Sequence, residues 1–192
     1  MHAGLPSMRT PETVLEEPLD PRSLRNALGR FATGVTIITT TQPDGKREGL
    51  TANSFAALSL DPPMVLWSLG NRASSLPGFL ASGRFAINVL DSSQVSLAQH
   101  FAKPRVDKFE GIDVFEGLGR CPLMRCALAS FECRTDRTLE AGDHWLFIGV
   151  IERARYRDGE ALVFQAGRYG LATAMPSTLV GPEQDLGWGG LG

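Results

Sequence analysis

The chain has 192 residues, 43% of them hydrophobic and 21% charged, which is near the average of globular proteins and enough for one well-buried core. The formal net charge is -2, and lysine and arginine are scattered, which argues against nucleic acids and anionic membranes as partners. No stretch approaches the roughly 20 apolar residues that a membrane-spanning helix needs.

Residues 1–19 contain several prolines and glutamates and show no apolar period. This composition is typical of a flexible N-terminal arm and lacks the apolar segment of a signal peptide, so we expect a cytoplasmic protein. One folded domain is expected over residues 20–174. A Gly- and Pro-rich, loosely ordered C-terminal tail is expected over residues 175–192.

A helix is expected to begin at Asp20 and Pro21. Asp20 can accept hydrogen bonds from the free amides of the first turn, and Pro21 suits the first helical position. Leu24, Leu28 and Phe31 follow at helical spacing, and this stripe is expected to lie on the core.

The next segments are typical of β-structure. Residues 35–41 are all β-branched, and the turn signal at 43–46 predicts a hairpin whose second strand spans 48–54. Residues 55–60 are expected to continue that strand. The two prolines in 61–63 predict a break after it.

Residues 64–69 are nearly all apolar, which predicts a strand buried on both faces. Asp91 with Gln94 resembles a capping box, which opens a helix through Val95, Ala98 and Phe101. A turn signal at 157–160 predicts a second hairpin. The remaining elements expected are a short helix at 74–82 and strands at 85–90, 127–139, 145–156 and 161–165.

These elements amount to six or seven strands with two or three short helices between them. The strands are joined by tight turns rather than by regular strand–helix–strand crossovers. The sequence therefore predicts a mainly β protein with an antiparallel barrel, rather than a doubly wound parallel sheet.

Three cysteines, Cys121, Cys126 and Cys133, lie within one short stretch. Their odd number and the absence of a CxxC pair argue against a disulfide framework and against a zinc site. We interpret them as reduced thiols that fill apolar space, and we expect no metal.

A first candidate binding segment is residues 49–55. Small and hydroxyl-bearing residues at the end of a strand leave backbone amides accessible, as a flat heterocycle rimmed by carbonyls and ring nitrogens requires. The same residues also suit an ordinary strand edge.

A second candidate segment is residues 68–75, between a buried strand and a helix. Ser74 and Ser75 at a helix start offer donors to a phosphate, and Arg72 can supply the counter-charge. Alternatively, one serine is only a helix cap and Arg72 is solvated.

A third candidate pairs His100 and Phe101 with the segment 107–109, whose cation and aromatic ring could cover one edge of a cofactor. The alternative is a surface helix end with Phe101 in the core. His144 opens a strand at the rim of the expected barrel and could be structural or catalytic. The sequence contains no GxSxG, HExxH, Walker A or GxGxxG motif, so a nicotinamide would not use a dinucleotide fold here.

Together these segments resemble the flavin reductase family with the FMN-binding split-barrel fold, the small reductase components of two-component flavin-dependent monooxygenases. The resemblance runs from Leu24 to Tyr169 and covers about three quarters of the chain. Its most specific parts are residues 34–39, 49–55, 58–63, 85–90, 100–101 and 142–144. The resemblance implies an antiparallel Greek-key split β-barrel with a few peripheral helices.

The resemblance also implies roles for individual residues. A wall for the isoalloxazine ring would come from the segment 51–54 and from the end of the next strand. The ribityl chain and phosphate would lie at the helix start, and a further segment would close over the cofactor. In this reading the cofactor-binding residues are Thr51, Ala52, Asn53, Ser54, Ser68, Leu69, Asn71, Arg72, Ser74, Ser75, Phe101, Ala102 and Lys108. His144 would orient the nicotinamide at the open face of the flavin.

The function implied is an NAD(P)H-dependent flavin reductase that passes hydride to non-covalently bound FMN or FAD and supplies reduced flavin to a monooxygenase. The family forms homodimers with the flavin near the subunit interface. Two alternatives stay open. One is a flavoprotein that holds FMN tightly and reduces a quinone or nitro compound, and the other is a non-catalytic flavin-binding module.

Overall fold

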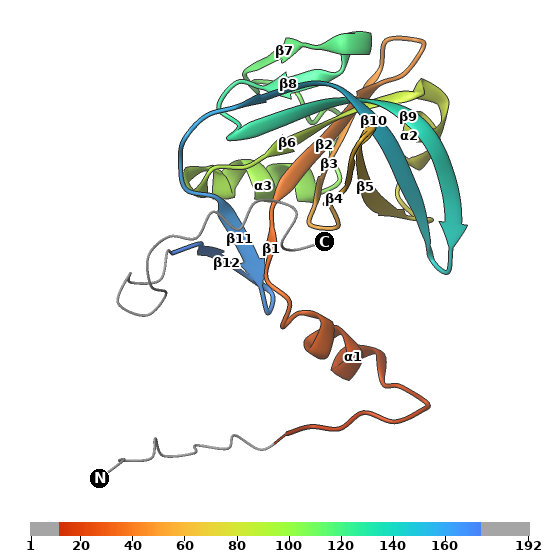
Figure 1. Cartoon of the computed structure of the whole chain (residues 1–192), viewed down its shortest axis with the longest axis vertical. Helices are drawn as coiled ribbons and strands as arrows, with labels where there is room; N and C mark the ends of the chain where they lie inside the picture. Colours follow the sequence, from red (N-terminus) through yellow and green to blue (C-terminus); the bar gives the residue numbers. More distant parts are fainter. Residues whose placement is uncertain (1–11, 174–192) are drawn as a thin grey trace.

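The main feature of the computed structural model, which describes residues 12–173, is a seven-stranded antiparallel sheet in the order β3-β2-β6-β9-β10-β5-β4 (Figure 1). Two small sheets, β1-β11-β12 and β7-β8, lie beside it. The strands are β1 Thr33–Gly34, β2 Thr36–Thr41, β3 Arg47–Ala52, β4 Ala56–Leu60, β5 Pro63–Gly70, β6 Arg84–Val89, β7 Val114–Glu116, β8 Pro122–Met124, β9 Ala129–Ala141, β10 His144–Tyr156, β11 Leu162–Gln165 and β12 Arg168–Leu171. The helices are α1 Pro21–Leu28, α2 Leu76–Ser82 and α3 Val95–Ala102, with short 3₁₀ turns at Ser92–Gln94 and Leu118–Arg120.

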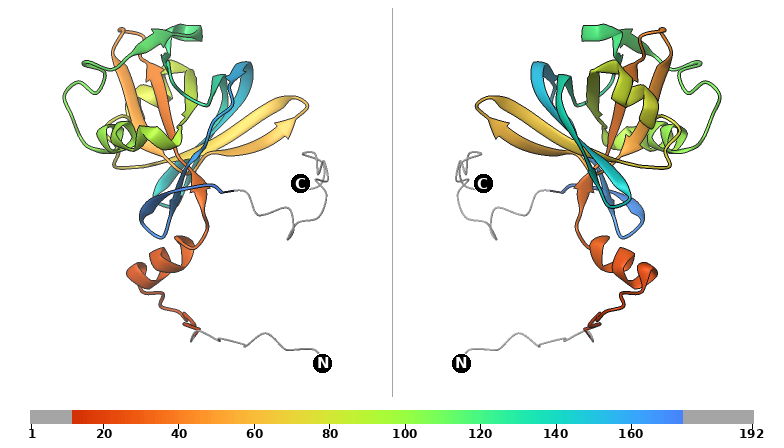
Figure 2. Two further views of the ribbon diagram at one scale, coloured as in Figure 1. Left: turned by 90° about the vertical axis from the view of Figure 1, so that its left-hand side faces the viewer. Right: turned by 90° about the vertical axis from the view of Figure 1, so that its right-hand side faces the viewer.

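The predicted antiparallel, mainly β architecture is confirmed, and the sheet is open between β3 and β4. These two edge strands follow each other in the chain, so residues 53–55 cross from one edge of the sheet to the other. Residues 55–60 therefore form a separate strand and do not continue β3, as the sequence had suggested. The β4–β5 hairpin diverges from the β2–β3 hairpin (Figure 2). At the crossing, the Ser54 hydroxyl donates to the Ser68 carbonyl and accepts from the Ser68 amide, both at 3.0 Å.

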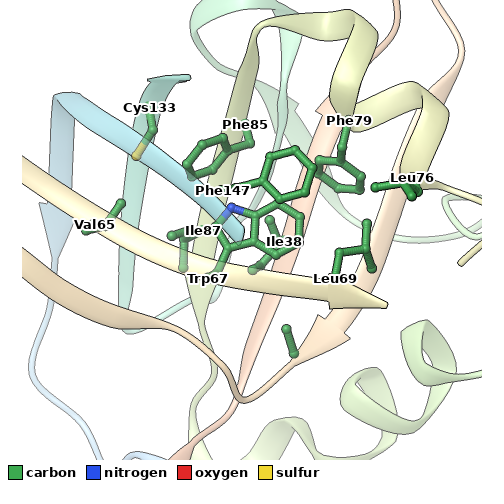
Figure 3. Packing of buried hydrophobic residues seen from close by; sticks show 11 residues of the cluster. Ile38, Val65, Trp67, Leu69, Leu76, Phe79, Phe85, Ile87, Cys133 and Phe147 are labelled. Carbon is green, nitrogen blue, oxygen red and sulfur yellow. The ribbon is translucent and has the colours of Figure 1, made fainter. Parts of the chain in front are cut away.

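The largest core cluster fills the space enclosed by the curved sheet and α2 (Figure 3). Trp67 of β5 stacks on Phe147 of β10, with ring centroids 4.5 Å apart. Phe79 of α2 and Phe85 of β6 meet the same indole edge-on, at 5.0 and 5.7 Å. Offset-stacked and edge-to-face pairs are the arrangements that aromatic rings prefer. These contacts hold β5, β6, β10 and α2 together.

A second core cluster holds α3 against β2, β11 and the β8 end. Phe101 and Ala98 of α3 are fully buried there beside Ile37 and Leu162. The predicted capping box is present: the Asp91 carboxylate accepts from the Ser93 amide at 3.0 Å, and the Gln94 side chain accepts from the Asp91 amide at 2.8 Å.

Helix α1 begins where predicted, and the Asp20 carboxylate caps the Ser23 amide at 2.8 Å. The expectation that its apolar stripe lies on the core is wrong. The helix ends at Leu28, before the predicted Phe31, and both side chains are exposed, by 68% and 78%, because this segment extends away from the sheet (Figure 1). Helical spacing identified which apolar residues share a face. It could not show whether the core of the chain covers that face.

Two expectations about strands are also wrong. In β5 burial alternates, so Val65, Trp67 and Leu69 are buried while Met64 and Leu66 are only half-buried. An antiparallel strand with one face on the core shows this alternation, whereas burial on both faces is typical of parallel sheets. The turn at 157–160 makes no hairpin, because β11 pairs with β1 and β12 rather than with β10.

No helix within residues 12–173 combines the length and the apolar character needed to cross a bilayer. Residues 1–11 and 174–192 lie outside the described residues, so most of the predicted arm and the predicted tail cannot be compared with the structure.

The three cysteines are free thiols, and only Cys126 is exposed. Burial raises the pKa of Cys121, and it raises the pKa of Cys133 to about 12. A raised pKa lowers the thiolate fraction at pH 8, and the thiolate is the nucleophile. We therefore expect Ellman's reagent at pH 8 to modify only Cys126 rapidly in the folded protein and all three thiols after denaturation. Rapid reaction of the C126S variant would contradict this burial.

Candidate functional site

The edge strand β3 organises the candidate site, because one side of its backbone is not paired in the sheet. The Gln42 amide donates to the Lys46 carbonyl at 2.8 Å, which fixes the register of the β2–β3 hairpin. In an antiparallel ladder, backbone groups of alternate residues point to opposite sides. The amides and carbonyls of Arg47, Gly49 and Thr51 therefore face the free edge. The Gly49 carbonyl accepts a hydrogen bond from Lys108 there, and the other groups could meet a ligand.

The side chains of the predicted segment 51–54 alternate in direction. Thr51 donates to the Ala98 carbonyl of α3 at 2.6 Å, while Ala52 is buried in the main core. Asn53 is exposed, and Ser54 is the bridge to Ser68 described above.

A pocket of about 190 Å³ opens at this end of β3. It brings Thr51, Ala52 and Asn53 together with Ala102, as the sequence predicted, and with two aromatic residues that the sequence did not single out, Phe164 and Tyr169. Of the other residues predicted for this wall, Leu69 points into the core and Phe101 is fully buried. These two can shape the pocket only from behind.

A second pocket, of about 260 Å³, lies along the first residues of β3 and against the start of α2. Ser75 is 7% exposed, and its hydroxyl makes no capping bond to the helix. Lysine and arginine outnumber the single acidic side chain in the lining. The residues that line this pocket are Lys46, Arg47, Glu48, Gly49, Ser74, Ser75, Pro104, Arg105, Val106 and Lys108.

The positive charge of this second pocket suits an anion. The Glu48 carboxylate, 2.6 Å from the Lys46 ammonium, hydrogen-bonds to it and raises the pKa of that lysine. Desolvation lowers the pKa of Lys108. Hydroxyl and cationic donors facing one cavity are what a phosphate group needs. Predicted Ser74 and Ser75 are joined here by Lys46, Arg47 and Arg105. Sequence reasoning missed these three cations because they are exposed and belong to no motif.

Lys108 joins the loop at 103–113 to β3. Its ammonium donates to the carbonyls of Gly49 at 3.0 Å and Phe101 at 2.9 Å, and the Lys108 carbonyl lies 2.8 Å from His100 Nε2. Gly49 allows this close approach: a Cβ there would lie 2.8 Å from the Phe101 ring and 2.9 Å from the Phe109 ring. Of the third predicted constellation, Lys108 lines the second pocket, whereas Phe101 lies in the core.

His144 lies at the tip of the β9–β10 hairpin, beside the end of β5. Its Nδ1 is 2.7 Å from the Asp143 carboxylate, and this contact lowers the pKa of Asp143, with a smaller contribution from Arg72. The Asn71 amide donates to the Asp143 carbonyl at 2.9 Å, and its side chain donates to the Gly142 carbonyl at 3.3 Å.

Asn71 and Arg72 thus belong with His144 rather than with the lining of the second pocket. The sequence could not show this, because the partner hairpin is about 70 residues away in the chain. The His144 side chain is 49% exposed and can meet a ligand from solvent.

Comparison with known proteins identifies the family. Residues 28–172 match the model of the flavin reductase like domain, and this match spans most of the chain. The chain belongs to this family. The resemblance found in the sequence is confirmed, and with it the assignment to flavin reductases among the oxidoreductases.

Several curated relatives are flavin reductases. The FMN reductase (NADH) SmoA of Agrobacterium fabrum is 44% identical over 149 residues, which cover 78% of this chain and 84% of that protein. The flavin-dependent monooxygenase reductase subunit HsaB of Rhodococcus jostii is 40% identical over 157 residues, covering 81% and 80%. The chain spans only 49% of the probable flavin reductase of Rhizobium meliloti, with 40% identity.

Solved structures agree with the fold. The NADH:FAD oxidoreductase SgcE6 of Streptomyces globisporus superposes with a TM-score of 0.80 at 35% identity, over 86% of this chain and all of that one. A nitrilotriacetate monooxygenase component B homologue from Mycobacterium thermoresistibile gives a TM-score of 0.78 at 35% identity, over 84% of this chain and 93% of that one.

Proposed function

We propose that this chain is an NAD(P)H:flavin oxidoreductase that transfers hydride from a reduced nicotinamide to non-covalently bound FMN or FAD. The observation that carries the proposal is the free edge of β3, which joins two pockets into one cradle. The pocket at 51–53 suits a flat ring, and the pocket at 46–49 with Ser74 and Ser75 suits a phosphate.

The residues present fit a flavin. Backbone groups of Thr51 face the free edge, where they could pair with the pyrimidine side of the ring, and Asn53 adds an exposed amide. The buried Ser75 hydroxyl, which makes no capping bond, could donate to the phosphate, and Lys46 and Arg47 could neutralise it.

A flavin held in this cradle would supply the hydride-accepting chemistry, and a reduced nicotinamide would supply the hydride. The chain's own residues would position the flavin and the nicotinamide and would stabilise charge on the flavin ring. Donors at the β3 edge would stabilise negative charge on a ring bound against them, since fixed dipoles cost no reorganisation during the reaction. His144, on its hairpin tip, orients the nicotinamide for close approach.

An anaerobic assay tests the proposal. Purified protein is mixed with FMN, FAD or riboflavin and with NADH or NADPH, and loss of the visible flavin absorbance is followed. Catalytic bleaching of free flavin in excess over protein is expected. Flavin binding without bleaching would instead indicate a non-catalytic binding module, and purification as a yellow protein with slow flavin exchange would indicate a tightly held cofactor with another acceptor.

His144→Ala is expected to raise the KM for the nicotinamide and to lower kcat/KM about ten- to hundred-fold, which is about 1.4–2.7 kcal/mol. Loss of the imidazole removes contacts to the nicotinamide and leaves the flavin pockets intact. Stopped-flow reduction by NADH measures the effect, and flavin affinity serves as the internal control. Reduction kinetics equal to those of the unmodified protein would remove His144 from the site.

We also propose that the protein is a homodimer, with α1 as one contact. Leu28 at the end of α1 and Phe31 just beyond it are large apolar side chains that the described residues leave exposed. Light scattering is expected to give twice the chain mass, and Phe31→Asp is expected to shift the protein toward monomer. A monomeric unmodified protein would overturn this proposal.

A monooxygenase is the proposed recipient of the reduced flavin. The family match and relatives described as reductase subunits of flavin-dependent monooxygenases support this partner. A cytoplasmic location is proposed as well, supported by the free thiols of Cys121, Cys126 and Cys133.

A further inference from the structure

A third pocket, of about 540 Å³, lies at the tip of the β2–β3 hairpin. It is lined by Gly45, Lys46, Arg47, Val106, Asp107, Phe109 and Glu110. Three of these residues, Lys46, Arg47 and Val106, also line the pocket assigned to the flavin phosphate. The two pockets therefore adjoin across a shared ridge, and a ligand could cross from one into the other.

The three pockets follow one another along β3. The first lies at residues 51–53, the second at 46–49 and the third at 45–47. Because an antiparallel strand rises about 3.4 Å per residue, the row from Asn53 to Lys46 is about 24 Å long. FAD has the same linear order of parts: the isoalloxazine ring, the ribityl phosphate, the second phosphate and the adenosine.

The side chains at each position match this order. Lys46 and Arg47 stand at the ridge, where the two phosphates of FAD would lie. Arg47 pairs with Glu116 through half-exposed side chains, whereas Lys46, which is 61% exposed, pairs with a Glu48 carboxylate that is only 15% exposed. Exposed pairs contribute little and rearrange easily, so the Arg47 guanidinium can turn to a ligand, while Lys46 adds its positive charge at the same ridge.

Beyond the ridge, the third pocket changes character. The carboxylates of Asp107 and Glu110 can accept hydrogen bonds from ribose hydroxyls, as acidic side chains do in nucleotide sites. Among the ion pairs of residues 12–173, none engages Glu110. Val106 is fully exposed and offers apolar contact to a purine, while Phe109, which is 8% exposed, lines the pocket from the core side.

We propose that this third pocket binds the adenosine half of FAD, with Lys46 and Arg47 on the pyrophosphate, and that the protein binds FAD more tightly than FMN. The inference rests on the proposed flavin-reductase function and adds the choice of flavin to it.

Equilibrium titration of flavin fluorescence, without nicotinamide, tests the inference. The unmodified protein is expected to bind FAD at least about fivefold more tightly than FMN. Glu110→Trp fills the third pocket and is expected to remove this preference, with the FMN Kd changed by less than about twofold. Glu160→Trp is the matched control, since Glu160 is exposed and lines none of the three pockets, and it is expected to leave both Kd values unchanged.

Equal Kd values for FMN and FAD in the unmodified protein would overturn the inference. A preference for FAD that survives Glu110→Trp would also overturn it, because the adenosine would then lie elsewhere. If neither flavin binds the unmodified protein, the proposed function itself fails, and this outcome differs from either of the other two.

Discussion

Ser75→Asp is expected to weaken FMN binding at least about 100-fold, which corresponds to about 2.7 kcal/mol. Ser75 is buried at the start of α2 and lines the pocket assigned to the phosphate. A carboxylate there would face a phosphate at short range. Two like charges about 4 Å apart repel by about 4 kcal/mol at the effective dielectric constant found near protein surfaces.

Riboflavin provides the internal control for this substitution, since it has the same ring without a phosphate. Its affinity is expected to fall by less than about threefold in Ser75→Asp. Ser96→Asp, on the exposed side of α3, is the matched charge control and is expected to bind FMN normally. An equal loss for FMN and riboflavin would mean that Ser75 does not face the phosphate. Circular dichroism would verify that each variant is folded.

Trp67→Ala is expected to lower the free energy of unfolding by about 3–5 kcal/mol, as large-to-small changes of buried aromatic residues do. The indole is fully buried between Phe79, Phe85 and Phe147. Its loss would leave a cavity at the point where β5, β6, β10 and α2 meet. Urea denaturation followed by circular dichroism measures the change.

Leu66→Ala is the control for this substitution, because Leu66 is on the opposite, half-buried face of β5. Its cost is expected to stay below about 1.5 kcal/mol. Trp67→Phe keeps an aromatic ring in place and should fold even if the alanine variant does not, with an intermediate loss. If Leu66→Ala costs as much as Trp67→Ala, the assignment of the two faces of β5 is wrong.

Local patterns predicted most of the strands and helices. The β-branched run that became β2, the hairpin turn after it, and the capping box at Asp91 and Gln94 depend on neighbours in sequence, and all three are present. Pairing between strands that are distant in sequence was harder to predict. The turn at 157–160 looks like a hairpin locally, but β11 is held by β1, which lies about 130 residues earlier.

The candidate site also contains residues that local sequence patterns predicted and residues that they did not. Residue type and placement singled out segment 51–54 and the pair Ser74–Ser75. Residues 51–53 line the first pocket, Ser54 is hydrogen-bonded to Ser68, and the two serines line the second pocket. Lys46 and Arg105 were not predicted, because a cation on an exposed turn becomes informative only when tertiary folding sets it opposite the serines. Arg72 was assigned to the phosphate by sequence proximity, whereas its charge helps to lower the pKa of Asp143 on another hairpin.

A crystal structure with FMN bound would test the single cradle along β3 most directly. We expect the ring to lie against residues 51–54 and the phosphate to lie within hydrogen-bonding distance of Ser75 and of the Lys46–Arg47 ridge. A flavin seated elsewhere, for example in the arginine-lined hollow between β8 and the end of β10, would contradict the assignment.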